Sequence, residues 1–272
     1  MADPLPLSRL QDLESFAVDL ARAAGAAILP LFRADHGLED KGGPGAFDPV
    51  TAADKGAEAA IRAAIAARFP EHGVIGEEYG EDRADAEFVW VLDPIDGTRA
   101  FVAGLPLWTT LIGLRFQGRA TVGVIAQPYL DEIYVGAAPG SRLIRPQGVE
   151  RLQVRPCPSL AEAVIATTDL DLFTGAEAAA WTQVRAAARI ARFGCDAYAF
   201  AMVAAGTMDL VLEAGLKPWD IEAAIPLLEG AGGLVTDWRG ETLGTQGGQV
   251  AAAGDRECLE QALVALKRAA TP

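Results

Sequence analysis

An apolar segment that runs directly into two carboxylates constrains this chain most strongly. Residues 88–92 read Phe-Val-Trp-Val-Leu, as expected of a buried strand, and Asp93-Pro94-Ile95-Asp96-Gly97-Thr98 follows. The proline and the glycine make the backbone turn there. Carboxylates at the end of a buried strand are costly unless a positive charge lies beside them. Because oxygen ligands favour hard cations, the run predicts a Mg²⁺ site.

The composition limits the architecture and the partners. With 272 residues, of which 51% are hydrophobic and 22% charged, the chain suits one large globular domain or two fused lobes. The formal net charge of −14 argues against a nucleic-acid partner, because no basic stripe is present. It does not exclude an anionic substrate, since bound metal ions can reverse the local field.

The cysteines and histidines are few. Cys157, Cys195 and Cys258 are widely spaced and form no CxxC pair, which predicts free thiols in a reducing cytoplasm. His36 and His72 are the only histidines, and we expect both at the surface. We expect no secretory signal and no membrane span, because neither a basic start with an apolar core nor a long uncharged apolar run is found.

Hydrophobic periodicity predicts alternating helices and strands. Ser8 is expected to cap the first helix and Thr51 to start the second, while Gly118 and Asp131 mark turns between strands. The expected helices are 8–33, 51–69, 176–189, 195–205, 219–230 and 256–269. The expected strands are 74–75, 88–92, 107–116, 120–126, 132–137, 141–145, 163–167, 190–193, 209–213, 233–236 and 250–253. This alternation favours a layered α/β fold.

Several acidic residues lie where a predicted element begins or ends. They are Asp54 in the first turn of a helix, Glu77 and Glu78 after a strand, Asp93 and Asp96 after the next strand, and Asp220 at the start of a helix. Asp54 or Asp220 alone could be a favourable partner of a helix dipole. A capping or turn role explains either Asp93 or Asp96 but not both. Together these residues are better explained as metal ligands.

Four motifs carry a resemblance to a known family. They are Asp48-Pro49-Val50-Thr51-Ala52-Ala53-Asp54, Gly76-Glu77-Glu78, Trp90-Val91-Leu92-Asp93-Pro94-Ile95-Asp96-Gly97-Thr98 and Trp219-Asp220-Ile221-Glu222-Ala223-Ala224. In this order, they resemble the inositol monophosphatase family of Mg²⁺-dependent, lithium-sensitive phosphatases. The resemblance implies an αβαβα sandwich of the inositol monophosphatase and fructose-1,6-bisphosphatase type, and usually a homodimer. It implies a single domain over residues 1–272, with lobes at about 1–145 and 146–272.

The resemblance also implies roles for individual residues. Glu77, Asp93 and the carbonyl of Ile95 would hold one Mg²⁺, and Asp93, Asp96 and Asp220 a second. Two or three ions per site are implied, with Asp54 near a third or bridging through water.

The remaining implied roles concern the water and the phosphate. Thr98 and Glu77 would orient and deprotonate the attacking water, and the N–H groups of Gly97 and Thr98 would bind phosphate oxygens. Asp96 and Asp220 would also face the substrate, and Lys41 would help a loop to close the site.

The chemistry of phosphate esters agrees with this set of ligands. Hydrolysis of a phosphate dianion needs charge neutralisation and an aligned water. Two metals about 4 Å apart clamp the attacking and leaving oxygens and lower the pKa of the water. We find no Cys or Ser nucleophile in a phosphate-binding loop, which favours direct attack by water.

Other segments resemble the histidinol-phosphatase branch of the family, which acts in histidine biosynthesis. They are Arg99-Ala100-Phe101, residues 104–114, Gly194-Cys195-Asp196-Ala197-Tyr198 and residues 213–220. Histidinol phosphate carries an ammonium group and an imidazole, so its pocket needs acidic groups. Asp196 and Glu213 are therefore candidates to bind the cationic end.

Alternatives exist for each of these residues. Asp196 could cap or precede a helix, and Arg99 could pair with an acid or face solvent. Trp108 and Trp219 are more often core residues than substrate platforms. The competing functions are an inositol or sugar-phosphate monoesterase, a 3′-phosphoadenosine or fructose-bisphosphate phosphatase, and a non-catalytic homologue.

Overall fold

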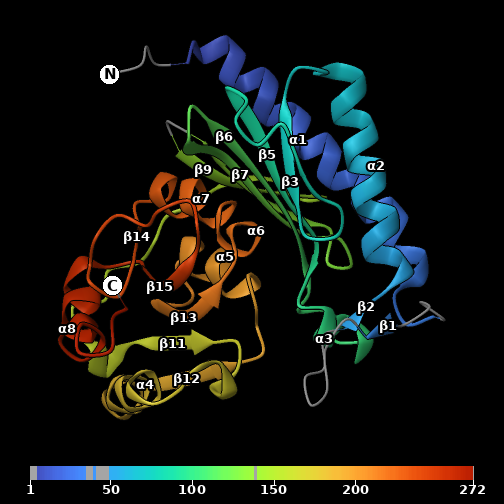
Figure 1. Ribbon diagram of the computed structural model, residues 1–272. Coiled ribbons are helices and arrows are strands. Elements are labelled where there is room, and N and C mark those ends of the chain that lie inside the picture. Colours follow the sequence, from blue (N-terminus) through green and yellow to red (C-terminus); the bar gives the residue numbers. More distant parts are fainter. Residues whose placement is uncertain (1–4, 35–38, 41–48, 138–139, 272) are drawn as a thin grey trace.

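Two main sheets, separated and flanked by helices, form most of the fold, and two short strands pair in a third (Figure 1). The computed structural model describes residues 5–34, 39–40, 49–137 and 140–271. Lys41 and His36 lie outside the described residues, so the predictions made for them stay predictions.

The larger sheet has eight strands in the order β10-β9-β8-β7-β6-β5-β3-β4. Their bounds are β3 (Gly73–Gly76), β4 (Gly80–Asp82), β5 (Phe88–Asp96), β6 (Thr109–Phe116), β7 (Arg119–Gln127), β8 (Glu132–Ala137), β9 (Gly140–Arg145) and β10 (Gly148–Arg151). Neighbouring strands are antiparallel except for β3 and β5, which are parallel. The ends of β3 and β5 that lead into the acidic motifs therefore lie side by side.

Helices α1 (Leu7–Ile28) and α2 (Ala52–Arg68) cover one face of this sheet (Figure 1). Their apolar faces pack with Trp90, Ile112 and Val124 into a core cluster. Ser8 is not the helix cap that we expected, because α1 begins at Leu7 with Pro6 before it and no capping side chain. The helix also ends earlier than expected, since Pro30 lies in the 3₁₀ turn Leu29–Leu31 that follows it.

The smaller sheet has five strands in the order β12-β11-β13-β15-β14. Their bounds are β11 (Val164–Thr167), β12 (Ile190–Phe193), β13 (Leu210–Leu216), β14 (Leu234–Thr236) and β15 (Gly248–Ala253). Helices α4 (Ala176–Ala187) and α8 (Arg256–Leu266) pack on its outer face. Helices α5 (Tyr198–Ala204), α6 (Pro218–Ile221) and α7 (Ala224–Gly230) lie between the two sheets. The layers are therefore α, β, α, β, α, as predicted.

The remaining short elements complete the chain near its edges. They are α3 (Thr98–Val102), β1 (Glu39–Asp40), β2 (Pro49–Val50) and the 3₁₀ turns Leu160–Glu162 and Leu170–Leu172. The strands β1, β2, β4 and β10 were not predicted. Among the described helices, none combines the length and the apolar composition that a membrane crossing requires.

A row of glycines brings the middle helices unusually close to the larger sheet. Gly113, Gly123 and Gly136 are register neighbours on β6, β7 and β8. A β-carbon at Gly123 would lie 1.9 Å from the carbonyl oxygen of Ala223, and one at Gly136 would lie 2.2 Å from the Cα of Leu227. The backbone of this helical segment therefore rests directly on the sheet, which fixes the end of α6 relative to β5 and β6.

The predicted surface position of His72 is wrong, whereas the predicted core position of Trp108 is confirmed. His72 is 1% exposed, so its prediction as a surface residue is wrong. Its ring stacks between Phe69 and Phe88, with centroid distances of 4.5 and 4.7 Å, and the indole N–H of Trp90 donates to its Nδ1 at 3.0 Å. Trp108 is fully buried, which confirms it as a core residue.

Candidate metal centre

The acidic motif at the end of β5 lies at an irregularity in the sheet. Asp93 pairs with Leu111 and Asp96 pairs with Thr109, so β5 contains one residue more than β6 over this stretch. Such a bulge bends the strand and re-aims the side chains. The predicted strand 88–92 therefore continues to Asp96, and the motif lies within its distorted end.

Side-chain hydrogen bonds fix the backbone of this turn. The hydroxyl of Thr110 donates to the carbonyl of Pro94 at 2.8 Å, and the hydroxyl of Thr98 donates to the carbonyl of Ile95 at 3.0 Å. Gly97 has a φ of 82°, a left-handed conformation that costs glycine little. The chain then enters α3 at Thr98. The positions of both carboxylates are thus set by the backbone around them.

Asp93, Asp96 and Asp220 come together into one carboxylate cluster. An oxygen from each lies within 4.8 Å of the others. Asp220 comes from α6 in the middle helical layer, where the backbone N–H of Lys217 donates to it at 2.6 Å. The cluster therefore joins the end of the larger sheet to the helical layer between the two sheets.

Burial and mutual repulsion make the cluster unfavourable as a set of bare anions. Asp93 is 2% exposed, and its Oδ1 has no hydrogen-bond partner among the described residues. Burial and the nearby charge of Glu77 raise the pKa of Asp93 well above its usual range. Burial and the charge of Asp196 do the same for Asp96, and burial raises the pKa of Asp220 to about 6.

These residues fit a hard divalent cation. The donors are carboxylate oxygens, and the unpartnered Oδ1 of Asp93 is the kind of atom that a metal ion would satisfy. Asp93, Asp96 and Asp220 could therefore hold a metal ion.

Glu77 and Asp54 approach this cluster from two other elements. Glu77 follows β3, and its N–H donates to the carbonyl of Leu92 at 3.2 Å, which places it beside the end of β5. Asp54 is 2% exposed, and its Oδ2 accepts from the N–H and the hydroxyl of Thr51 at 2.8 and 2.5 Å. The charges of Glu77 and Asp54 both raise the pKa of Asp93, so both lie close enough to act on it.

Asp196 lies directly against the metal motif. A β-carbon at Gly97 would be 3.1 Å from Cγ of Asp196, and the N–H of the next residue, Ala197, donates to Asp96 at 2.6 Å. Asp196 has a φ of 45°, and its burial raises its pKa to about 6. It does not cap a helix, because α5 begins at Tyr198, three residues after the predicted start, with no capping side chain.

Glu213 and Arg99 are the other two residues predicted to face the leaving group, and both lie near enough to Asp196 to interact with it electrostatically. Glu213 in β13 is 2% exposed and accepts from the N–H and hydroxyl of Thr168 at 2.8 and 3.0 Å. Burial raises its pKa to about 8, against these hydrogen bonds. Arg99 is exposed and forms an ion pair with Asp169 at 3.1 Å, which decides between the predicted alternatives of pairing and facing solvent alone.

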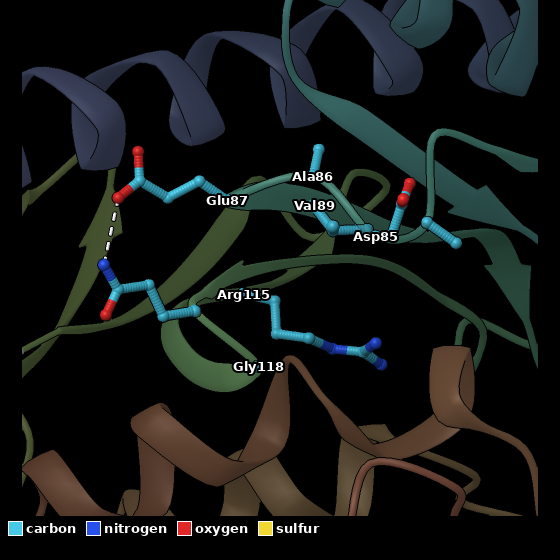
Figure 2. A pocket seen from close by; sticks show the side chains of 8 residues that line it. Asp85, Ala86, Glu87, Val89, Arg115 and Gly118 are labelled. Atoms are coloured by element: carbon cyan, nitrogen blue, oxygen red, sulfur yellow. Dashed lines mark hydrogen bonds between the residues drawn. The ribbon is translucent and has the colours of Figure 1, made fainter. Parts of the chain in front are cut away.

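A separate cavity of about 480 Å³ lies beside the larger sheet and contains none of the predicted site residues. Figure 2 shows the side chains of Glu87 and Arg115 extending in different directions. The amide nitrogen of Gln117 donates to Oε1 of Glu87 at 3.0 Å. The Nε–H of Arg115 donates to Oε2 of Glu222 at 3.1 Å. Because Glu222 directly follows α6, this ion pair supports the segment that carries Asp220.

A comparison with known families gives this geometry its context. The model of the inositol monophosphatase family matches residues 9–270. The chain belongs to the inositol monophosphatase family.

Similar proteins support this membership. The chain is 40% identical to a bifunctional phosphatase IMPL2, chloroplastic, of Arabidopsis thaliana, over 94% of this chain and 76% of that protein. It is 35% identical to a histidinol-phosphatase of Chlorobaculum parvum, over 71% of this chain and 73% of that protein. A solved inositol monophosphatase from Zymomonas mobilis superposes with a TM-score of 0.84 at 39% identity, covering 94% of this chain and 98% of that one.

Sequence reasoning missed two residues that support the site in this member of the inositol monophosphatase family. Thr110 holds the carbonyl of Pro94, and Glu58 accepts hydrogen bonds from the turn that follows β3. Glu58 had a detectable signal, because it is an acidic residue one helical turn after Asp54 with Arg62 a further turn away. Thr110 had none, because its role depends on the bulge.

Proposed function

We propose that this phosphatase of the inositol monophosphatase family is a Mg²⁺-dependent histidinol-phosphatase, which converts L-histidinol phosphate and water into L-histidinol and phosphate. One observation carries the choice of substrate. Asp196 places a carboxylate against Gly97, beside the cluster of Asp93, Asp96 and Asp220, and Glu213 adds a second acid nearby. The similarity to a named histidinol-phosphatase supports the same choice.

The metal ligands proposed are the carboxylates of Glu77, Asp93, Asp96 and Asp220 together with the carbonyl of Ile95, for two or three Mg²⁺ ions. When bound, Mg²⁺ would neutralise the phosphate and acidify a water. The raised pKa of Asp93 supports this set, because a cation would relieve the crowding that raises it. Asp54 would act beside them, through water or at a third ion.

The attacking water would be oriented and deprotonated by Thr98 and Glu77. The Thr98 hydroxyl already donates its proton to the carbonyl of Ile95 at 3.0 Å. Its oxygen is therefore left with lone pairs that can accept a hydrogen bond from the water. The N–H groups of Gly97 and Thr98 would bind phosphate oxygens, with Asp96 and Asp220 facing the ester.

The leaving group would extend away from the metal cluster toward Asp196, Glu213 and Arg99. Its ammonium and imidazole would pair with the two carboxylates. Arg99 would shape this end of the site through its ion pair with Asp169. A polyol leaving group offers no charge to these acids, so their burial would cost free energy without compensation.

The main alternative is an inositol-1-monophosphatase or a broad sugar-phosphate phosphatase, which the similarity to the Zymomonas mobilis protein supports. A 3′-phosphoadenosine or fructose-bisphosphate phosphatase would need added basic residues near the site. Steady-state kinetics with Mg²⁺ on histidinol phosphate and inositol 1-phosphate decide the matter. A higher kcat/KM on inositol 1-phosphate would refute the assignment.

We further propose that residues 1–272 act as a single domain and that the protein is a cytoplasmic homodimer. The carboxylate cluster joins both lobes, which supports a single functional domain. The three cysteines are free and buried, which suits a reducing compartment. An apolar hollow of about 420 Å³ near the exposed Leu170 and Phe193 offers a surface for a second copy. Light scattering of the purified protein tests the dimer.

A further inference from the structure

The turn that presents Glu77 is held by a residue from another element. The N–H groups of Glu78 and Tyr79 donate to the carboxylate of Glu58, at 2.8 Å to Oε2 and 3.2 Å to Oε1. Glu58 lies on α2 and is fully buried. The backbone immediately after Glu77 is therefore anchored to a helix rather than to the sheet.

The carboxylate of Glu58 also lies against the backbone just before Glu77. A β-carbon at Gly76 would be 2.1 Å from Oε1 and 2.8 Å from Oε2 of Glu58. No ordinary side chain fits between them. Glu58 therefore contacts the turn on both sides of Glu77, and residue 76 must be glycine for this contact to form.

Arg62 completes the support from the same helix. Its Nε donates to Oε1 of Glu58 at 2.7 Å, and its terminal nitrogen donates to the carbonyl of Gly80 at the far end of the turn. Asp54, Glu58 and Arg62 are spaced by four residues, so they share one face of α2. This face reaches from the metal cluster to the far end of the turn.

We propose that Glu58 is a positioning residue for the metal centre, which acts by fixing Glu77 in the geometry needed to bind Mg²⁺. The inference rests on the proposed role of Glu77 as a ligand. The Glu58–Arg62 ion pair, in which Glu58 is buried and Arg62 is partly exposed, contributes little net stability compared with apolar packing. Its two backbone hydrogen bonds give it a different role, because they hold the residues on either side of a ligand. Supports of this kind around a metal ligand commonly set its affinity.

The first test replaces Glu58 by glutamine, which keeps the size of the side chain. In Glu58→Gln, the amide oxygen can still accept a hydrogen bond from one backbone N–H of the turn. The amide nitrogen would face the other N–H, which is also a donor, so that hydrogen bond is lost and the turn loosens. We expect Mg²⁺ affinity, measured by calorimetry on the full-length protein, to fall by about 10- to 100-fold. Because the Glu77 ligand remains, saturating Mg²⁺ should restore most of kcat. Glu77→Gln should not be restored in this way.

The matched control is Glu14→Gln. Glu14 is a mostly buried glutamate of α1, and its ion-pair partner is Arg142 of β9 rather than a residue of the turn at 76–80. It should lose some thermal stability and keep the Mg²⁺ affinity of the unchanged protein. If Glu58→Gln behaves like Glu14→Gln, with normal Mg²⁺ affinity, the proposal is refuted.

A second variant approaches the same contact from the turn. Gly76→Ala introduces a β-carbon against the Glu58 carboxylate, so it should weaken Mg²⁺ binding in the same way. In the double variant Glu58→Ala with Gly76→Ala, the clash is removed and thermal stability should partly recover, while Mg²⁺ affinity stays low. Recovery of both properties would contradict a positioning role.

The experiments distinguish a failure of the role proposed for Glu58 from a failure of the proposed function. If the unchanged protein binds Mg²⁺ but cleaves no phosphate monoester, the proposed function fails while the affinities still test Glu58. If it cleaves esters and Glu58→Gln binds Mg²⁺ normally, only the role of Glu58 fails.

Discussion

The metal side of the site and the side that would face the leaving group hold their carboxylates in different ways. Asp93 and Asp96 come from one stretch of backbone, fixed by strand pairing and by the hydroxyls of Thr98 and Thr110. Asp196 lies in the turn between β12 and α5 and Glu213 lies in β13, so these two acids come near each other only through the topology of the smaller sheet. Strand β11 lies between β12 and β13, so Thr168, which follows β11, can bind Glu213.

Because of this difference, a single substitution should disturb more residues on the metal side than on the side that would face the leaving group. A change on the metal side disturbs a continuous turn and therefore several proposed ligands at once. On the other side, each acid is supported by its own neighbours, so one can be replaced without moving the next. We expect chemistry to depend on the first side and choice of substrate on the second.

The largest effect is expected from Asp93→Asn, which removes the charge of a buried carboxylate that we propose as a metal ligand, with little change in shape. We expect kcat to fall by about three orders of magnitude, comparable with the loss of a preorganised electrostatic contact in a dry site. Calorimetry should show weaker Mg²⁺ binding. Because burial raises the pKa of Asp93, the variant should also melt higher than the unchanged protein in EDTA. Near-normal turnover would show that the metal side is wrongly identified.

The acids on the other side should make the metal-free protein less stable as the pH rises. Glu213 has a folded-state pKa of about 8 and an ordinary value of 4.5, so the folded state holds its proton more tightly. Stability is therefore lost progressively between about pH 4.5 and 8, by at most a few kcal/mol at about 1.4 kcal/mol per pKa unit.

Glu213→Gln tests this pH dependence directly. Its amide oxygen can still accept from Thr168, but it carries no titrating proton. Thermal melts in EDTA at pH 5 and pH 8 should show the advantage of the variant growing with pH. A constant difference between the two proteins would show that Glu213 does not titrate in this window.

Asp196→Asn tests whether the side that would face the leaving group determines the choice of substrate. Asparagine tolerates the φ of 45° at this position and removes only the charge. We expect kcat/KM on histidinol phosphate to fall by about 10- to 100-fold, as for a charge-assisted hydrogen bond, with a much smaller loss on a neutral phosphate ester. Equal losses on both esters would make Asp196 a support of the metal side.

The smallest effects concern the contact that joins the two sides. Gly123→Ala would place a β-carbon 1.9 Å from the carbonyl oxygen of Ala223 and should destabilise the protein by about 1–3 kcal/mol. Gly56→Ala is its control, since that site in α2 is open and alanine should stabilise the helix by about 0.5–1 kcal/mol. Urea denaturation measures both. Equal stability changes would mean that the glycine row is not a close contact.

The layered fold and the position of the acidic motif at the end of β5 could be predicted from the sequence because their signals are local. The strand at 132–137 and the strand at 190–193 agree with the structure residue for residue, and the capping box of Thr51 and Asp54 follows from adjacent positions. The run from Asp93 to Thr98 carries its own turn signals.

The rest depends on contacts between distant parts of the chain. His72 is buried because Phe69, Phe88 and Trp90 surround it, which its own neighbourhood in the sequence does not reveal. The predicted helix 219–230 is divided into α6 and α7, between which Glu222 pairs with Arg115 of β6.

The glycine row on β6, β7 and β8 limits how the two sheets can move relative to each other. With no layer of side chains between the sheet and the backbone of the segment from Ala223 to Leu227, neither lobe can slide past the other without a steric clash. The two sheets are therefore expected to keep their relative position while a substrate binds, so that the carboxylate cluster, which draws residues from both sides of this contact, keeps its geometry.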